Sequence, residues 1–341
     1  MLRRGTPRLT KRWHSEIPDH VIAAGFSSDG KRIATAAISG LVAVFDSASG
    51  MRQFDLPGHR FGTSAIAWQP NSNLLASAGQ DSFVRLWDAD RGVKIGELSG
   101  GANWVECLAW NQAGDILASG AGKKVRLWRP DGSMLRDYPP LGSTVADICW
   151  RPGSNDLTTT SYGSVSVWIP EGDSPKRVFE KPVSLLCAAW SPDSKYLAAG
   201  AQDASVYFWI WKSGRDLQMG GYPTKVRPPA WDRTSRFLAT GGSAWALVWD
   251  CSGKGPEGTR PLMLEGHAED KLVTALTYQK KGDILASGGA DGKIILWQPI
   301  TSQRPVTQLQ LNAGISALTW SPDERLLLAG TETGSLFVYS V

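Results

Sequence analysis

Histidines, the side chains that most often serve acid–base and metal chemistry, are few in this sequence. Among its 341 residues there are four histidines, His14, His20, His59 and His267. An imidazole can act as a general base or as a metal ligand. His14 and His20 lie close together in the sequence, but no third ligand is indicated beside them. The sequence therefore predicts neither a metal ion nor a cofactor.

The cysteines also lack the spacing of a metal site. No Cys-x-x-Cys or mixed Cys/His pattern is present. Free cysteine often fills small buried positions, so we expect reduced thiols in the core, which fits a cytosolic chain. The four cysteines are Cys107, Cys149, Cys187 and Cys251.

Sequence motifs that carry catalysis are absent as well. There is no G-x-S-x-G, no P-loop and no H-E-x-x-H. The run at 120–125, GAGKKV, resembles a phosphate loop only faintly and precedes a strand, not a helix. Asp29, Asp193 and Asp323 recur at one turn offset and are interpreted as turn formers. We therefore expect no catalytic residue and no enzymatic activity.

The chain is organised by a motif that occurs eight times. A large aromatic ends an apolar run, an aliphatic residue follows at plus seven, and a second aromatic follows at plus eighteen or nineteen. The first anchors are Phe26, Trp68, Trp110, Trp150, Trp190, Trp231, Tyr278 and Trp320. The second anchors are Phe45, Trp87, Trp128, Trp168, Trp209, Trp249, Trp297 and Tyr339.

Each repeat has the pattern of a β-sheet. Residues 84–87, 125–128 and 294–297 alternate or run apolar over four positions, as short strands do, and turn residues bound them. Units of about forty residues with four short strands bury their faces by stacking radially. We therefore predict one all-β propeller domain over residues 1–341, with eight blades, or alternatively seven blades plus an irregular unit.

Several stretches resemble WD40 repeats, among them LLASAGQDSFVRLWD and ILASGGADGKIILWQ. The resemblance covers about residue 20 to the end. It implies an internal hydrogen-bond network of a Gly-His histidine, a serine, a turn aspartate and a tryptophan. Two repeats match this set fully: His59, Ser77, Asp81, Trp87 and His267, Ser287, Asp291, Trp297. The other six repeats lack the histidine, which places their networks in doubt.

The last repeat stops at Val341, just after its second anchor, so its fourth strand is missing from that end. We predict that residues 7–14 supply it by pairing with 335–341, which would close the ring and remove an open sheet edge. Residues 1–6 are expected to form a flexible basic tail. Deleting residues 1–15 is expected to destabilise the protein strongly.

Charge and hydropathy restrict the partners. The net charge is +4, and basic residues gather at the start, as Arg3, Arg4, Arg8, Lys11 and Arg12. This arm makes a nucleic-acid adaptor one alternative function, although nucleic acid is not the expected partner. No apolar run is long enough to span a membrane, and the N-terminus is not a signal peptide. We expect a cytoplasmic protein that is monomeric on its own.

The best candidates for function are aromatics that do not recur in every repeat. They lie in the connections between second and third strands or between repeats, which share one face of a propeller. Tryptophan and tyrosine are common in binding hot spots. We therefore predict a non-catalytic scaffold that holds partner proteins through Phe61, Trp104, Tyr162 and Trp245, beside the basic residues Arg60, Lys123, Lys225 and Lys271. A ligand or metal in the central channel, near Glu106 and Asp147, is the other alternative.

Overall fold

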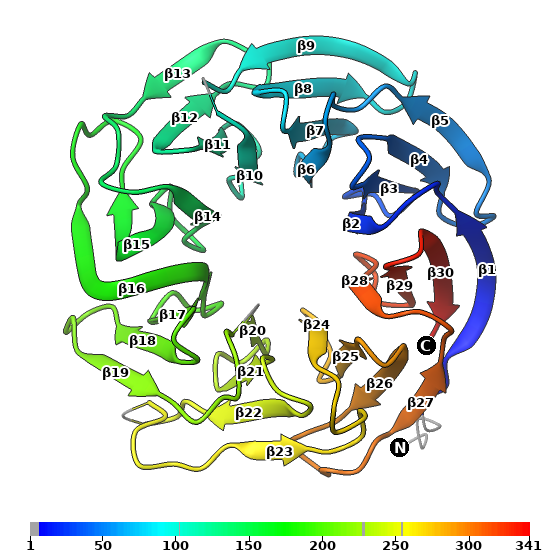
Figure 1. Ribbon diagram of the computed structural model, residues 1–341, viewed down its shortest axis with the longest axis vertical. Coiled ribbons are helices and arrows are strands. Elements are labelled where there is room, and N and C mark those ends of the chain that lie inside the picture. The colour runs from blue at the N-terminus through cyan, green and yellow to red at the C-terminus, as the bar shows by residue number, and fades with distance from the viewer. Residues whose placement is uncertain (1–6, 102, 227–228, 254) are drawn as a thin grey trace.

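The computed structural model describes residues 7–101, 103–226, 229–253 and 255–341. In these residues every regular element is a β-strand, and the strands form antiparallel sheets arranged as a ring around a central channel (Figure 1). The described part of the chain contains no helix that is long and apolar enough to cross a membrane. The all-β propeller predicted from the sequence is confirmed.

Six of the sheets have four strands each. They consist of β2 (Val21–Phe26), β3 (Arg32–Ala37), β4 (Val42–Asp46) and β5 (Arg52–Leu56); β6 (Thr63–Trp68), β7 (Leu74–Gly79), β8 (Phe83–Asp88) and β9 (Val93–Ser99); β10 (Val105–Trp110), β11 (Leu117–Ala121), β12 (Lys124–Trp128) and β13 (Met134–Asp137); β20 (Ala230–Trp231), β21 (Phe237–Thr240), β22 (Ala246–Asp250) and β23 (Leu262–Leu264); β24 (Val273–Tyr278), β25 (Leu285–Gly289), β26 (Lys293–Trp297) and β27 (Thr307–Gln310); and β1 (Thr10–Glu16), β30 (Ser335–Ser340), β29 (Leu326–Thr331) and β28 (Ile315–Trp320).

The seventh sheet has six strands and holds two sequence repeats. The prediction of eight blades is therefore corrected in part: the described chain forms seven hydrogen-bonded sheets, which is compatible with the predicted alternative of seven blades plus an irregular unit. Each of the two repeats keeps its own half of this sheet, because β14 and β15 lead by successive pairing to the first part of β16, and β17 to β19 follow its second part. β16 pairs with β15 through residues 177–184 and with β17 through residues 185–190, and it turns inward between these two parts, so one strand ends one repeat and begins the next (Figure 1). The strands of this sheet are β14 (Val145–Trp150), β15 (Leu157–Trp168), β16 (Arg177–Trp190), β17 (Tyr196–Ala201), β18 (Val206–Ile210) and β19 (Asp216–Met219).

The N-terminal strand closes the ring. β1 pairs antiparallel with β30, with Thr10 opposite Ser340 and Glu16 opposite Ser335. The closing strand was predicted from the terminal repeat, but it runs over Thr10–Glu16 instead of 7–14. The first six residues, the predicted tail with Arg3 and Arg4, lie outside the described residues.

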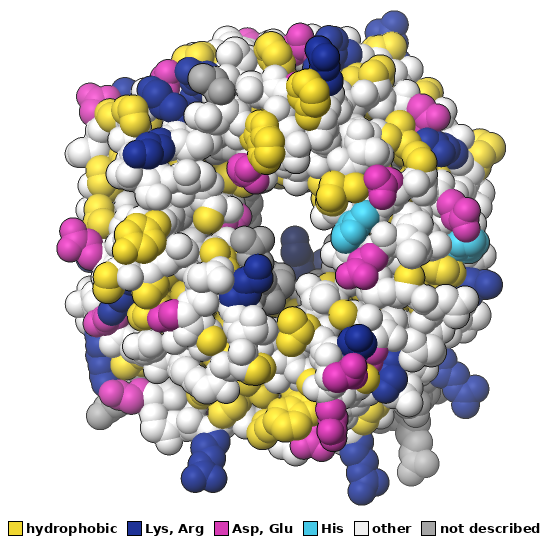
Figure 2. Space-filling model, viewed as in Figure 1, with side chains coloured by type: hydrophobic (Ala, Val, Ile, Leu, Met, Phe, Trp, Pro, Cys, Tyr) yellow, Lys and Arg dark blue, Asp and Glu magenta, His cyan; other side chains and the backbone are white. Residues whose placement is uncertain are grey.

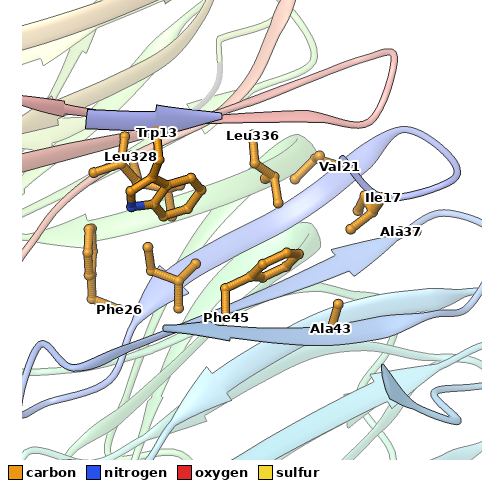
Figure 3. Close-up of a cluster of buried hydrophobic side chains, with 11 residues drawn as sticks. Trp13, Ile17, Val21, Phe26, Ala37, Ala43, Phe45, Leu328 and Leu336 are labelled. Carbon is orange, nitrogen blue, oxygen red and sulfur yellow. The ribbon is translucent and has the colours of Figure 1, made fainter. Parts of the chain in front are cut away.

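One side chain of β1 joins the last sheet to the first. Trp13 is buried in a cluster with Phe26, Phe45 and Leu328, and its indole Nε1 donates to the Ser47 carbonyl at 2.8 Å (Figure 3). The ring centroids of Trp13 and Phe45 are 6.4 Å apart. Closure therefore rests on packing and a side-chain hydrogen bond as well as on strand pairing.

The recurring first anchors join neighbouring repeats. Most tryptophans at this position donate their indole N–H to a backbone carbonyl on the inner strand of the preceding repeat. Trp190 instead donates to the Thr158 hydroxyl at 2.8 Å. Repetition of this bond explains why tryptophan is favoured here, since phenylalanine has no donor. The carbonyl-directed bonds are Trp68 to Gly25 (3.0 Å), Trp110 to Ala67 (3.2 Å), Trp150 to Ala109 (2.9 Å), Trp231 to Ala189 (3.2 Å) and Trp320 to Thr277 (3.2 Å).

The antiparallel order gives the disc two different faces. We call the loop face the end of the sheets where second strands connect to third strands and each repeat connects to the next. We call the turn face the opposite end, where first strands turn into second strands and third strands into fourth. The channel passes through the disc between them, and on the face seen in Figure 2 hydrophobic side chains are scattered around its mouth.

Candidate interaction face

The two predicted histidine networks are present below the loop face. His267 Nδ1 lies 3.1 Å from Asp291 Oδ1, and its Nε2 lies 2.8 Å from Ser287 Oγ. Trp297 Nε1 donates to the same hydroxyl at 2.8 Å, so the hydroxyl proton is available to His267 Nε2 and the imidazole carries its proton on Nδ1. The His59, Ser77, Asp81 and Trp87 set has matching contacts at 2.8 to 2.9 Å.

Close packing explains the glycine before the first network histidine. Gly58 has φ +56°, in the left-handed region that favours glycine, and a Cβ there would overlap the Gly40 carbonyl oxygen. The glycine therefore lets the connection into the second repeat pass close to the neighbouring sheet and places His59 under its aspartate.

A third network uses tyrosine where the other two use histidine. Tyr222 OH lies 2.7 Å from Thr240 Oγ1, and Trp249 Nε1 donates to the same phenol oxygen at 2.8 Å. Sequence reasoning missed this network because it searched for histidine. The signal was a Gly-Tyr pair placed as far before Thr240 as Gly58-His59 is before Ser77. The doubt about the histidine-free repeats is thus resolved for the sixth repeat.

The networks make the stability of the fold depend on pH. Burial lowers the pKa of His59 and His267 below the ordinary value of 6.5, against the opposing effect of Asp81 and Asp291. Below pH 6.5 the unfolded chain therefore binds more protons than the folded chain, and the free energy of unfolding should decrease as pH falls from about 7 to about 5.5. Urea unfolding at several pH values measures this decrease. A His59→Gln/His267→Gln double variant should lose most of it, and an equal decrease in that variant would contradict the assignment.

The loop face carries the four predicted contact aromatics. Three are well exposed, with exposed fractions of 53% for Trp104, 60% for Tyr162 and 69% for Phe61. Trp245 is half-buried and packs against the core cluster of Phe208. Its role as an exposed contact anchor therefore has less support than that of the other three.

Trp104 lines a surface pocket, and none of the other three candidates is among its lining residues. The cavity has a volume of about 610 Å³, and its lining comes from the second to fourth repeats. Exposed Lys123 and Glu106 share it, and no ion pair to either is formed among the described residues. The lining residues are Gln80, Ser82, Asn103, Trp104, Glu106, Gly122, Lys123, Lys124 and Thr144.

Phe61 lies beside this pocket. A Cβ added to the next residue, Gly62, would lie 3.3 Å from the Gln80 side chain, which lines the Trp104 pocket. Phe61 has φ +71°, which is uncommon for an aromatic residue, and Arg60 lies over its ring at 4.8 Å. Tyr162 lies in the fourth repeat at the turn of the hairpin within β15, and its neighbour Ser161 pairs with Val145, the residue after the pocket-lining Thr144.

The two acids considered for a channel site, Glu106 and Asp147, have different surroundings. Asp147 Oδ2 accepts from the Ala188 backbone N–H at 3.0 Å, and Oδ1 accepts from Ile148 N–H at 2.9 Å. It therefore bridges neighbouring inner strands, while Glu106 lines the Trp104 pocket. Within the described residues no group of three His, Cys, Asp or Glu side chains is placed to hold a metal ion.

The remaining sequence candidates are dispersed. His14 stacks on Phe337 at 4.6 Å, and Arg8, Lys11 and Arg12 are exposed in or beside β1. The four cysteines form no disulfide in the described chain; Cys107, Cys187 and Cys251 are buried and Cys149 is half-buried. Burial raises the pKa of the Cys107 and Cys149 thiols well above the usual value.

A ring of antiparallel sheets around a channel, closed by pairing of the N-terminal strand with the last sheet, defines the β-propeller class. The sequence pattern described as WD domain, G-beta repeat matches residues 50–88, 92–129, 174–209, 258–298 and 303–340. Because these ranges cover more than half of the sequence, the chain belongs to the WD40 family. The unmatched stretches include the repeat with the short β20 and the one with the tight β15 hairpin.

Two relatives of the chain match it over only part of their own length. It is 29% identical to an uncharacterized WD repeat-containing protein of Schizosaccharomyces pombe over 60% of this chain and 38% of that protein. It is 23% identical to Actin-interacting protein 1 of Drosophila melanogaster over 98% of this chain and 47% of that protein. The chain thus spans less than half the length of these relatives.

A solved structure has the same fold. The crystal structure of the computationally designed Ika8 protein superposes with a TM-score of 0.79 at 22% identity, covering 96% of this chain and 98% of that one. The likeness concerns the arrangement of the sheets alone.

Proposed function

We propose that the chain is a non-catalytic interaction scaffold that holds a partner protein on its loop face at the Trp104 pocket. WD40 propellers generally bind other proteins, and one relative is named for its interaction with actin. The observation that carries the proposal is an exposed tryptophan inside a cavity that also offers one cation and one carboxylate without ion-pair partners among the described residues. Cytoplasmic location and the monomeric state stay predictions from the sequence.

The pocket has the features of a binding hot spot. A large, half-exposed aromatic supplies contact area at little entropic cost, and the surrounding polar groups set the orientation of a partner. Lys124 donates to Asp137 at 3.0 Å, so this side of the rim is held in place before binding. We infer that the partner inserts an apolar side chain against Trp104 and places polar groups on Lys123 and Glu106.

The test compares Trp104→Ala with a matched exposed residue on the turn face, Met51→Ala. Partners captured by the wild type should be lost with Trp104→Ala and kept with Met51→Ala. For a purified partner, we expect the dissociation constant to rise about 30-fold or more, the size of a hot-spot loss. Equal binding by both variants would move the site away from this pocket.

A further inference from the structure

The turn face holds a second pocket, separate from the Trp104 site. Its volume is about 690 Å³, and it is lined by the ends of the inner strands β10, β14, β16, β20 and β24 and by the turns that follow them. Because the inner strands surround the channel, this turn-face pocket is the channel mouth opposite the loop face (Figure 1). The volume is in the range of ordinary ligand sites.

The floor of the turn-face pocket is aromatic and rigid. It includes Trp110, Trp150, Trp190, Trp231 and Tyr278. Each of the four indoles donates its N–H to a protein oxygen, at 2.8 to 3.2 Å. The polar atoms of the indoles are therefore already satisfied inside the protein, so these rings offer hydrocarbon to a ligand, while the Tyr278 hydroxyl has no hydrogen-bond partner among the described residues.

The rim of the pocket is positively charged. Three cations, Arg151, Arg233 and Lys280, line it, and no acidic residue of the described chain does. Arg151 Nη1 lies 3.1 Å from Asp156 Oδ2 and Arg233 Nε lies 2.8 Å from Asp283 Oδ1, so these two cations already pair with carboxylates that are not lining residues. Lys280 forms no ion pair among the described residues, so it is the cation most available to an incoming anion.

The positive charge continues outward from the rim. Trp211 has the Arg151 guanidinium 4.6 Å from its ring centroid and the Arg177 guanidinium at 4.3 Å. Arg177 also donates to the Trp211 carbonyl, and it has no carboxylate partner in the part of the chain that the structure describes. An acidic ligand in the pocket would thus find further cations along the surface of the fourth and fifth repeats.

We propose that the turn-face pocket is a second docking site, which takes an acidic segment of a partner protein with one apolar side chain on the aromatic floor. Carboxylates beside that side chain would meet Lys280 and Arg233 at the rim. Charge complementarity selects an acidic occupant, and the hydrocarbon floor requires an apolar group next to the acid. The site is independent of the Trp104 pocket and lies on the other face.

A nucleic acid fits these features less well. Binding of bases without sequence preference relies on open aromatic faces. Here Trp231 stacks on Tyr196, with centroids 5.9 Å apart, and Trp190 lies beneath Arg151 at 5.2 Å. One face of each of these two rings is therefore already covered, which leaves less open aromatic surface for stacked bases.

Fluorescence anisotropy with a labelled peptide, Glu-Glu-Leu-Phe-Glu-Glu, tests the proposal on the full chain. We expect saturable binding below 1 mM, at least tenfold weaker for Lys-Lys-Leu-Phe-Lys-Lys and for a peptide of six glutamates. Lys280→Glu should weaken binding at least tenfold, whereas the loop-face variant Lys271→Glu should not. Melting curves of both variants check that the fold is kept.

The outcomes separate the two sites and the two ligand classes. Trp104→Ala should leave peptide binding unchanged, so failure of the scaffold proposal at that pocket would not affect this result. No saturable binding up to 1 mM, or equal weakening by Lys280→Glu and Lys271→Glu, would overturn the proposal. Tighter binding of single-stranded DNA than of the acidic peptide, lost in Lys280→Glu, would also overturn it and assign the pocket to nucleic acid.

Discussion

Replacing Trp13 with alanine should lower the free energy of unfolding by about 3–5 kcal/mol, the usual cost of removing a buried tryptophan. The side chain is only 8% exposed, and it fills the seam between the last and first sheets. The change also removes the hydrogen bond to Ser47 and leaves a cavity against Phe45 and Gly50. Because β1 closes the ring, loosening it would expose the outer edge of β30. Urea-induced unfolding measures the loss.

The neighbouring residue supplies the control. Arg12 lies on the same strand but is exposed, so Arg12→Ala should change the stability by no more than about 0.5 kcal/mol. Deleting residues 1–15 should cost at least as much as Trp13→Ala. A truncated chain that melted like the full chain, or a Trp13→Ala loss below about 1 kcal/mol, would show that closure contributes little.

Replacing Asp81 with alanine should cost about 3 kcal/mol, the next largest effect. Its carboxylate accepts from His59 at 2.8 Å, from Arg85 at 2.7 Å and from the Arg60 backbone at 3.1 Å. Burial would raise the pKa of this carboxyl, but the hydrogen bonds from His59 and Arg85 hold it below the usual value. Removing the carboxylate leaves the His59 N–H without its acceptor and takes one of three acceptors from the Arg85 guanidinium, which keeps Glu97 and the Gly58 carbonyl.

Asp323 supplies the control, because it is an aspartate in an ordinary turn and belongs to no histidine network. Asp323 accepts from the Ser321 hydroxyl at 2.6 Å but is mostly exposed, so Asp323→Ala should cost about 1 kcal/mol. Urea unfolding of both variants gives the comparison. If Asp81→Ala were no more destabilising than Asp323→Ala, the network beneath the loop face would not be the support inferred for it.

The repeat made most of the fold predictable. Spacing and alternation located the strands, and the truncated last repeat located the closing strand to within a few residues. The sequence did not reveal that two repeats share β16, because the continuity of this strand depends on how the chain passes from one sheet to the next. It also missed the Tyr222 network, since a phenol can take the place of an imidazole only when geometry brings it to Thr240.

The candidate site was predictable in part. Non-recurring aromatics in the correct connections were identified, and three of the four are exposed. The sequence alone did not show that Trp245 is half-buried, because its burial depends on neighbours from other segments of the chain. The pocket that Trp104 shares with Glu106 and Lys123 is likewise completed by Gln80, Ser82 and Thr144 from the two neighbouring repeats.

The sequence by itself determined the class of fold, the closure of the ring and the two histidine networks. These follow from local periodicity and from fixed spacings inside one repeat, which the chain carries in every copy. Only the tertiary structure decided the number of separate sheets, the exposure of each loop aromatic and the cationic, aromatic mouth of the channel on the turn face. Those features are assembled from residues of several repeats, and their distances and burial arise only when the ring closes.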